Sequence, residues 1–372
     1  MKIHEYKTVK ERRQFLEKHL TVSLVNIEKA TVDTDESVHC ENRIGSVSVP
    51  LGIAGPLIVK GENIKGEHYL PLATTEGALV ASVNRGAKAC LEHGITTTVE
   101  RVGVTRGPVL KVSSPGEAKK IEAWIWDNRS VLGRKAEETS HHIKLTEVEV
   151  KTAGLYVFIR FNFDTDRAMG MNMATIASQF LIDYIQEKTK ARILSVAGNY
   201  DVDKKPSWLN SIKGRGFVVR AETIISKKNV ESILKTSVDR MCEVWKAKCL
   251  IGSALSGSMG FNAHHANVVA AFFLATGQDL AHVVGGSVGM TVLDVLPDGS
   301  LYASVSLPDL MMGSIGGGTG LKTQKEARLI LKTDSPLAMS EILGAGVLAG
   351  EVSLLASLSQ GTLARAHKAL GR

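Results

Sequence analysis

The chain has 372 residues, of which 44% are hydrophobic and 22% charged, a balance that is typical of a globular protein and excludes global disorder. Its length suits one large domain or two ordinary ones. The net charge of +7 favours anionic partners, but the sequence shows no RNP-like segment, C2H2 spacing or lysine-rich tail, so we expect no nucleic acid partner and interpret the charge as a basic enzyme surface.

The sequence carries no recognisable export or membrane signal. Residues 1–20 are charged throughout and lack the apolar core of a signal peptide. No uncharged apolar run approaches the roughly 20 residues that a membrane-spanning helix needs. The cysteines are scattered without a CxxC pair, which disfavours a disulfide framework or a structural zinc; they are Cys40, Cys90, Cys242 and Cys249. We therefore expect a cytoplasmic protein that does not contact a membrane.

A self-contained unit is expected between Pro108 and Val196. Ahead of it, Thr74 or Thr75 can cap a helix that runs to Gly94. Within it, the pattern reads strand, helix, strand, strand, helix, strand, which is the ferredoxin-like order. Periodicity and alternation place these elements at Val109 to Val112, Glu117 to Trp126, Ile143 to Val150, Leu155 to Phe161, Met169 to Lys188 and Ala191 to Val196. A change of phase near Thr146 indicates a β-bulge, and Ala153-Gly154 makes a turn.

The position of this unit inside the chain predicts the domain organisation. The flanking segments must form the other domain around it, and they are richer in helix. We predict an α+β protein with a large domain of residues 1–107 and 197–372 and an inserted small domain of residues 108–196.

Two of the helices expected in the large domain carry a charged residue where the pattern is apolar. One runs from Val230 to Cys249, and Lys248 continues its apolar stripe, so this lysine either meets an anion or extends its stem to the surface. The other runs from Ala263 to Ala281 and is apolar almost all round, which is typical of a core helix. Asp279 is out of place there, since an unpaired buried carboxylate costs several kcal/mol.

A dinucleotide-binding GxGxxG motif is absent. The nearest match, at Gly344 to Ala349, lies within a helix opened by Ser335-Pro336, where small residues favour close helix packing. Two other glycine clusters are better placed. Ala168 to Met173 opens a helix whose N–H groups favour a diphosphate, and the loop Gly316 to Thr319 lets a ligand approach its backbone. Either cluster alone could equally be a turn without a ligand.

Several polar residues gain meaning only together. Glu76 lies at a helix start, Asp203-Lys204-Lys205 follows the inserted unit, and His367 lies in a polar tail; each has an ordinary structural explanation. His264, His265 and His282 could suggest zinc, but the adjacent pair points apart and no third ligand keeps the expected spacing, so we expect no metal.

Taken jointly, the motifs resemble the successive signatures of the 3-hydroxy-3-methylglutaryl-CoA (HMG-CoA) reductase family. In order they are ENRIGSVSVPLGIAGP, LATTEGALVASVNRG, GVTRGPV, AMGMNM, AGNYDVDKKP, GSALSGSMGFNAHHANVVAAFFLATGQD, GSIGGGTGL and the tail LARAHK. The resemblance implies a helical substrate-binding domain interrupted by a ferredoxin-like cofactor domain. It implies the four-electron reduction of HMG-CoA to mevalonate and coenzyme A. The match is nearer to the animal and archaeal class than to the divergent bacterial one, and resembles the soluble prokaryotic forms.

The resemblance also implies residue roles. Lys204 would donate to the thioester oxygen, Glu76 would supply a proton to mevaldehyde, and Asp279 would hold both in place. His367 would protonate the thiolate of coenzyme A. Substrate binding would involve Arg106, Asp203, Lys205, Lys248, Asn267, Ser82, Asn84 and Arg85, in a site formed between the subunits of a homodimer or larger homo-oligomer. Cofactor binding would involve Ser140, His141, Arg167, Met169, Gly170, Met171, Asn172, Gly316, Gly317 and Thr319.

Three positions depart from the family pattern. The family usually carries aspartate directly before Ala-Met-Gly, whereas this chain has Arg167, and it often has arginine after the position of Ser140, where this chain has His141. An arginine favours a phosphate monoester, so we expect NADPH rather than NADH. The usual serine two residues before Asn-Tyr is Ala197 here, which removes one hydrogen bond to the substrate.

The sequence leaves three other hypotheses about function open. The same chemistry could run backwards, with NAD-dependent oxidation of mevalonate. A catalytically inactive CoA-binding protein of the same fold is disfavoured by the intact Glu76, Lys204, Asp279 and His367. A basic nucleic-acid-binding module is the most distant alternative.

Overall fold

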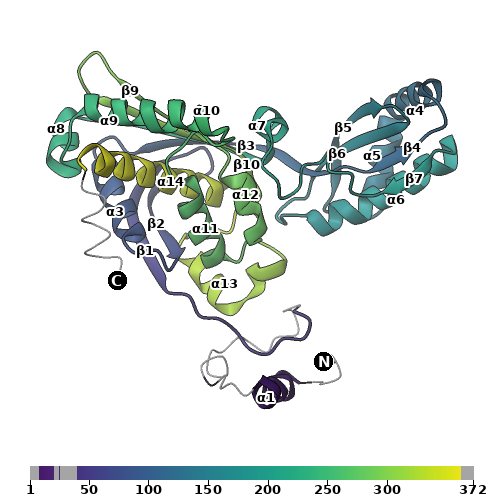
Figure 1. Ribbon diagram of the computed structural model, residues 1–372, viewed down its shortest axis with the longest axis horizontal. Coiled ribbons are helices and arrows are strands. Elements are labelled where there is room, and N and C mark those ends of the chain that lie inside the picture. Colours follow the sequence, from purple (N-terminus) through teal and green to yellow (C-terminus); the bar gives the residue numbers. More distant parts are fainter. Residues whose placement is uncertain (1–7, 21–24, 26–39, 362–372) are drawn as a thin grey trace.

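The computed structural model describes residues 8–20, 25 and 40–361 and has an α+β fold, as the sequence predicts. Figure 1 shows a larger body and a smaller unit joined through the middle of a common sheet. In spatial order, the strands of the larger body are β2 (Lys65–Ala73), β1 (Leu51–Lys60), β3 (Ile95–Arg106), β8 (Arg215–Ile225), β10 (Leu301–Leu310) and β9 (Met290–Val295). All these pairs are antiparallel except β1 with β3.

The centre of the larger body is helix α14 (Pro336–Ser359). Ser335 caps it by accepting from the N–H of Ala338, and Pro336 opens it, as predicted. The helix contacts α3 (Leu79–Cys90), α9 (Val238–Trp245), α11 (His265–Thr276) and the sheet. Its small residues make this packing possible, as predicted, since a Cβ on Gly346 would lie 2.4 Å from a methyl carbon of Leu70.

Helix α14 is long and apolar, although Glu341 and Glu351 interrupt its uncharged run. Among the described residues it is the one helix that is long and apolar enough to cross a membrane. However, 89% of its most apolar window is buried inside the protein, as expected for a core helix.

The remaining helical elements are short. They are α1 (Val9–Leu20), α7 (Trp208–Lys213), α8 (Lys227–Asn229), α10 (Ser253–Ser256), α12 (Val283–Gly286) and α13 (Lys322–Leu329), with π-helical turns at Val230–Leu234 and Lys246–Gly252 and 3-10 turns at Leu280–His282 and Gly317–Gly320.

The smaller unit has the predicted ferredoxin-like order. Its elements are β4 (Val109–Lys111), α4 (Pro115–Asp127), α5 (Arg129–Glu137), β5 (Lys144–Ala153), β6 (Tyr156–Asp164), α6 (Met171–Thr189) and β7 (Arg192–Ser195). The strand order is β7-β4-β6-β5, and the last residues of β3 pair with β6 beside β4. The bulge near Thr146 is confirmed by a register shift between Leu145 and Glu147. Helix α5 was not predicted, because it buries little besides Leu132 and Ala136.

Each unit has its own hydrophobic core. Leu348, Phe272 and Val219 belong to the cluster of the larger body, and Phe161, Leu181 and Ile125 to that of the smaller unit. The two separate cores support the division into residues 1–107 with 197–372 and residues 108–196, which remains our proposal.

Three helix predictions were wrong in detail. The helix expected from Val230 to Cys249 is interrupted at Lys235, which is left-handed with φ 60°, and its last part is π-helical. The wider π turn rotates the apolar stripe away from Lys248, which is exposed. The helix expected to reach Ala281 ends at Thr276, because left-handed Gly277 terminates it.

The third error concerns the start of α3. Neither threonine caps it: the helix begins at Leu79 after left-handed Ala78, which has φ 72°. The Thr74 hydroxyl instead accepts from the N–H of Glu76, so this carboxylate lies on a turn ahead of the helix. The stop near Gly94 is confirmed, since α3 ends at Cys90 and Gly94 is left-handed with φ 68°.

Candidate active site

The loop that follows the smaller unit presents Lys204 from a constrained backbone. Asn199, Val202 and Lys204 all have positive φ, at 64°, 50° and 56°. A β-branched valine rarely adopts this conformation, so the surroundings must hold it. Two contacts do so: the Asn210 amide donates to the Val202 carbonyl at 3.1 Å, and the Thr105 hydroxyl donates to the carbonyl of the preceding residue at 2.9 Å.

Lys204 forms an ion pair with Asp279 across 2.8 Å. Asp279 lies beyond the end of α11, where it caps a 3-10 turn by accepting from the N–H of Ala281 at 3.1 Å. The prediction that Asp279 lies inside an apolar helix was therefore wrong, because this residue is a half-buried cap beyond the helix end. Partial burial alone would raise the pKa of Asp279, but the hydrogen bonds from Lys204 and Ala281 hold it below its usual value.

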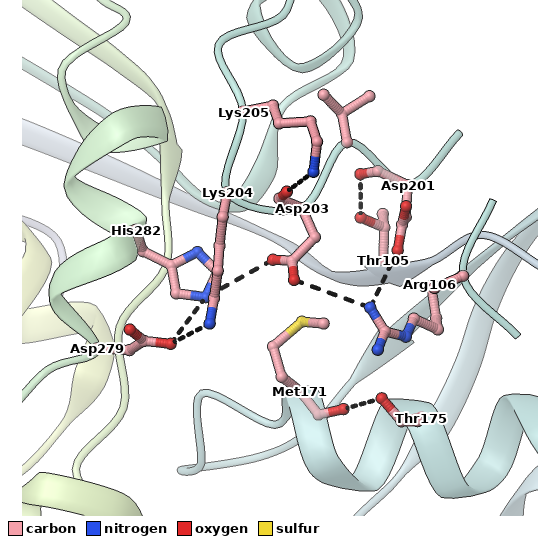
Figure 2. Close-up of polar contacts among 12 residues, drawn as sticks. Thr105, Arg106, Met171, Thr175, Asp201, Asp203, Lys204, Lys205, Asp279 and His282 are labelled. Atoms are coloured by element: carbon pink, nitrogen blue, oxygen red, sulfur yellow. Dashed lines mark hydrogen bonds and ion pairs between the residues drawn. The ribbon is translucent and has the colours of Figure 1, made fainter. Parts of the chain in front are cut away.

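A second carboxylate, that of Asp203, lies behind this pair. Figure 2 shows it between Arg106 on one side and His282 with Lys204 on the other. Arg215, which has no exposed surface, donates to Asp203 at 2.8 Å and to the Thr105 hydroxyl at 2.8 Å. The predicted substrate ligands Asp203 and Arg106 thus belong to a buried ionic network that holds the Lys204 loop.

The buried imidazole of His282 completes this network. Burial and the adjacent Arg215 lower the pKa of His282 to about 4, so the ring is neutral near pH 7. Its Nε2 lies 3.6 Å from Asp279 and 3.8 Å from Asp203. Because a neutral ring carries no charge of its own, Lys204 is the cation that faces the Asp279 carboxylate in this part of the site.

The second group of predicted residues surrounds an open cavity of about 1140 Å³. Lys248 and Asn267 line it, together with serines of the segment between them and with His264. The Asn267 amide donates to the Glu76 carboxylate at 3.0 Å, which places Glu76 beside the cavity. Among the described residues, no hydrogen bond or ion pair joins Glu76 to Lys204. Within one chain, the two proposed reactive groups are therefore held by different residues, Asn267 and Asp279.

The remaining predicted substrate ligands make contacts within the chain. Ser82 and Arg85, on α3, donate to the Ser353 hydroxyl on α14 at 2.9 and 3.0 Å. Asn84 accepts from the N–H of Gly55 at 2.7 Å, and the Lys205 ammonium donates to the Asp203 carbonyl at 3.2 Å. Burial lowers the pKa of Arg85.

The two glycine clusters lie side by side, although about 150 residues separate them in sequence. The N–H of Ser314 donates to the Arg167 carbonyl at 2.8 Å, and Ala168 pairs with Ile315 in a short parallel bridge. Helix α6 begins beyond left-handed Gly170, so its first N–H groups are free for an anion. A Cβ on Gly316 or Gly317 would meet nothing within 4 Å, which leaves room for a ligand at that backbone.

Several of the other predicted cofactor ligands make contacts within the chain. Met171 is buried and its sulfur accepts from Arg215 at 3.2 Å, whereas Thr319 is buried and donates to the Gly316 carbonyl at 2.7 Å. The Ser140 hydroxyl lies 3.8 Å from the sulfur of Met173 on α6. The side chains of His141, Met169 and Asn172 are partly or fully exposed.

The side chain of Arg167 extends from the glycine cluster at the start of α6 to Asp334, in the segment before α14. Its guanidinium donates to the carboxylate and carbonyl of Asp334 and, at 3.3 Å, to the Ser314 hydroxyl. The neighbouring Arg328 donates to the carbonyls of Ser314 and Thr319 at 2.5 and 2.9 Å. An exposed cation thus stands beside the two glycine clusters.

Sequence reasoning missed several of these residues. Arg215 lies in phase with the buried positions of β8, so alternation could have identified it as a buried charge. Arg328 gave no such signal, and the sequence suggested His282 only as a possible zinc ligand. The predicted His367 lies outside the described residues.

Comparisons with known proteins point to one family. The hydroxymethylglutaryl-coenzyme A reductase family model matches residues 8–372. The 3-hydroxy-3-methylglutaryl-coenzyme A reductase of Methanothermobacter thermautotrophicus is 45% identical over 98% of this chain and 93% of that protein. The protein of the same name from Blattella germanica is 40% identical over 88% of this chain and 40% of that protein. A class II reductase from Streptococcus pneumoniae, solved with NADPH in open conformations, shares the fold with a TM-score of 0.72 at 18% identity, over 96% of this chain and 98% of that one.

Proposed function

The chain belongs to the hydroxymethylglutaryl-coenzyme A reductase family, and we propose that it reduces HMG-CoA to mevalonate and coenzyme A with two molecules of NADPH. As a family member it is an oxidoreductase. The observation that carries the proposal is the 2.8 Å Lys204–Asp279 pair, held by a strained loop beside a buried ionic network.

Lys204 is the proposed oxyanion partner. As a thioester or aldehyde carbonyl is reduced, negative charge develops on its oxygen, and an ammonium donor stabilises that charge most when it is already in place. Asp279 fixes the ammonium group, and Asp203 with Arg215 fixes the loop from behind. The carbonyl oxygen of the substrate would therefore sit against Lys204.

Glu76 and His367 are the proposed proton donors. Glu76, supported by Asn267, would give a proton to the oxygen of mevaldehyde as it becomes an alcohol. His367 would protonate the departing thiolate, a role that the family resemblance assigns to the tail. Because Glu76 and Lys204 are not joined within one chain, we propose that the working site forms between two copies, and a homodimer is the minimum assembly.

The two adjacent glycine clusters fit a phosphorylated dinucleotide. A Cβ on Gly170 would lie 2.3 Å from the Thr165 hydroxyl oxygen, so this position excludes a side chain at the start of α6. The free N–H groups there and Arg167 would hold phosphate groups, with Gly316 and Gly317 admitting the ligand. A bound nicotinamide would supply the hydrides. We propose NADPH as the dinucleotide and the cytoplasm as its location.

The first test is HMG-CoA-dependent oxidation of NADPH. Lys204→Ala should lower turnover by about 10²–10³, the usual cost of removing an oxyanion partner. The matched control is Lys235→Ala, which makes the same change at another exposed lysine with positive φ, 60°, away from the site. An inactive wild type, or full activity in Lys204→Ala, would reject the mechanism; oxidation of mevalonate alone would favour the reverse reaction.

A further inference from the structure

A buried carboxylate that the reaction does not use lies in the middle of α14. Glu351 has no exposed surface and accepts hydrogen bonds from the N–H groups of Ala263 and His264, both at 2.7 Å. It also accepts from His264 Nδ1 at 2.7 Å and from the Thr291 hydroxyl at 2.6 Å. Four donors around one carboxylate form a complete binding shell for a negative charge.

The groups around Glu351 keep it ionised. Burial alone would raise its pKa, but His265, His264 and the Thr291 hydroxyl lower the pKa of Glu351 to about 2. His265 itself is neutral near pH 7, because burial lowers its pKa to about 4. The nearby Cys249 remains a thiol, since burial and Glu351 raise its pKa to about 12. The carboxylate is therefore the fixed charge of this cluster.

Glu351 holds the first turn of α11, which faces the large cavity. His264 is the residue before α11, and its side chain lines the cavity. With Nδ1 bound to Glu351, the imidazole has one orientation, and its other nitrogen remains for a ligand. One turn later Asn267 lines the same cavity and supports Glu76. One buried group thus sets the position of two cavity residues.

We propose that Glu351 is a positioning residue of this enzyme, which anchors the start of α11 so that His264 and Asn267 meet the acyl portion of the substrate in fixed places. The proposal rests on the reductase function proposed above. His264 contributes a hydrogen bond to a substrate oxygen, and Glu351 acts through it without touching the substrate. A carboxylate kept inside an apolar helix is destabilising until its partners compensate, and an apolar residue would fill the same space without this penalty.

Helix α14 offers a matched control. Glu341 is equally buried in the same helix, but it accepts from the N–H groups of Glu62 and Asn63, at 2.9 and 3.1 Å, in the β1–β2 turn. Glu341→Gln therefore removes a buried charge of the same kind from a place that does not line the cavity.

The test compares Glu351→Gln, Glu341→Gln and His264→Ala by steady-state kinetics and thermal unfolding. We expect Glu351→Gln and His264→Ala each to raise the KM for HMG-CoA about tenfold, the usual effect of losing a hydrogen bond to a charged group. The KM for NADPH should stay unchanged, and Glu341→Gln should change neither. The double variant Glu351→Gln/His264→Ala should raise the KM for HMG-CoA by less than the product of the two single effects, because both changes remove the His264 interaction, while Glu351→Gln also releases the turn that carries Asn267. Equal effects of the two glutamate variants, or additive effects in the double variant, would overturn the proposal.

Two further experiments test the proposal if Glu351→Gln does not fold or if the wild type does not reduce HMG-CoA. If Glu351→Gln does not fold, Thr291→Val removes one donor from the same carboxylate, and an unchanged KM for HMG-CoA would then count against the proposal. If the wild type does not reduce HMG-CoA, the proposed function fails, and ¹⁵N NMR of the His264 ring tests the positioning alone. We expect an Nδ1–H tautomer in wild type and Glu341→Gln that is lost in Glu351→Gln; unchanged ring signals in Glu351→Gln would overturn it.

Discussion

We propose Arg167 as the residue that most affects which dinucleotide the protein accepts. The family resemblance implies an aspartate at this position, and Arg167 lies beside the two glycine clusters, where Asp334 and Ser314 hold its guanidinium. Asp334 supplies the carboxylate that a phosphate monoester would displace. The arrangement holds a cation ready at the position from which aspartate would repel a phosphate.

We therefore expect a higher kcat/KM for NADPH than for NADH. Arg167→Ala should lower kcat/KM for NADPH about tenfold and leave that for NADH nearly unchanged, because only NADPH carries the additional phosphate. Arg129→Ala, at an exposed arginine of the same unit, is the control. A wild-type preference for NADH, or equal losses with both cofactors in Arg167→Ala, would contradict this account.

At the scale of elements, α3 and α14 approach each other closely in the core. A Cβ on Gly86 would lie 1.8 Å from the Ala349 carbonyl oxygen, so the two helices touch backbone to backbone. Since backbone cannot move aside as a flexible side chain can, the spacing of α3 and α14 depends on this glycine.

Paired glycine substitutions test this contact. Gly86→Ala should destabilise the protein by more than about 2 kcal/mol, because α3 must shift to admit a methyl group. In the interior of α5, a Cβ on Gly133 would meet nothing within 4 Å, and Gly133→Ala should stabilise the fold by about 0.5–1 kcal/mol. Denaturant unfolding of both variants measures the difference; similar midpoints would show that the packing is looser than described.

Local patterns predicted the elements that local interactions define. The ferredoxin-like order, the bulge near Thr146 and the Ser335-Pro336 helix start all follow from alternation, phase or capping, which act over a few residues. Periodicity could not predict the π turn that exposes Lys248, since the extra residue per turn has no sequence signature. Left-handed Gly277 was a readable stop signal, and using it would have placed Asp279 outside α11.

The same distinction between local patterns and long-range contacts applies to the site. Motifs identified Lys204, Asp279, Glu76 and Asn267, and the family resemblance implied that Asp279 would hold both Lys204 and Glu76. Within the described residues, Asp279 pairs with Lys204, whereas Glu76 is held by Asn267. The pairs Lys204–Asp279 and Asn267–Glu76 join segments far apart in the chain, so their contacts depend on the whole fold. The network behind Lys204 depends on Arg215, whose partners come from several different elements.

For the whole molecule, the buried histidines predict a loss of stability in mild acid. His265 and His282 have folded pKa values of about 4, below the unfolded value near 6.5, so the unfolded chain binds more protons between these values. Their contribution is complete above about pH 6.5 and lost as the pH falls towards 4. Glu351, with a folded pKa of about 2, adds a further loss below about pH 4.5.

Unfolding free energies should therefore fall by on the order of 2 kcal/mol between pH 7.5 and 5.5. Urea titrations at the two pH values measure this, and His93→Ala, at an exposed histidine, should keep the same dependence. Equal or greater stability at pH 5.5 would mean that the two buried rings are protonated in the folded protein.

The account as a whole rests on the four-electron reduction of one thioester at the Lys204–Asp279 centre. The most direct measurement is the stoichiometry of the purified enzyme with limiting HMG-CoA and excess NADPH. Two NADPH should be oxidised for each HMG-CoA consumed, with one mevalonate and one free thiol formed. One NADPH per HMG-CoA with accumulation of the aldehyde, or thiol release without oxidation of NADPH, would contradict the account.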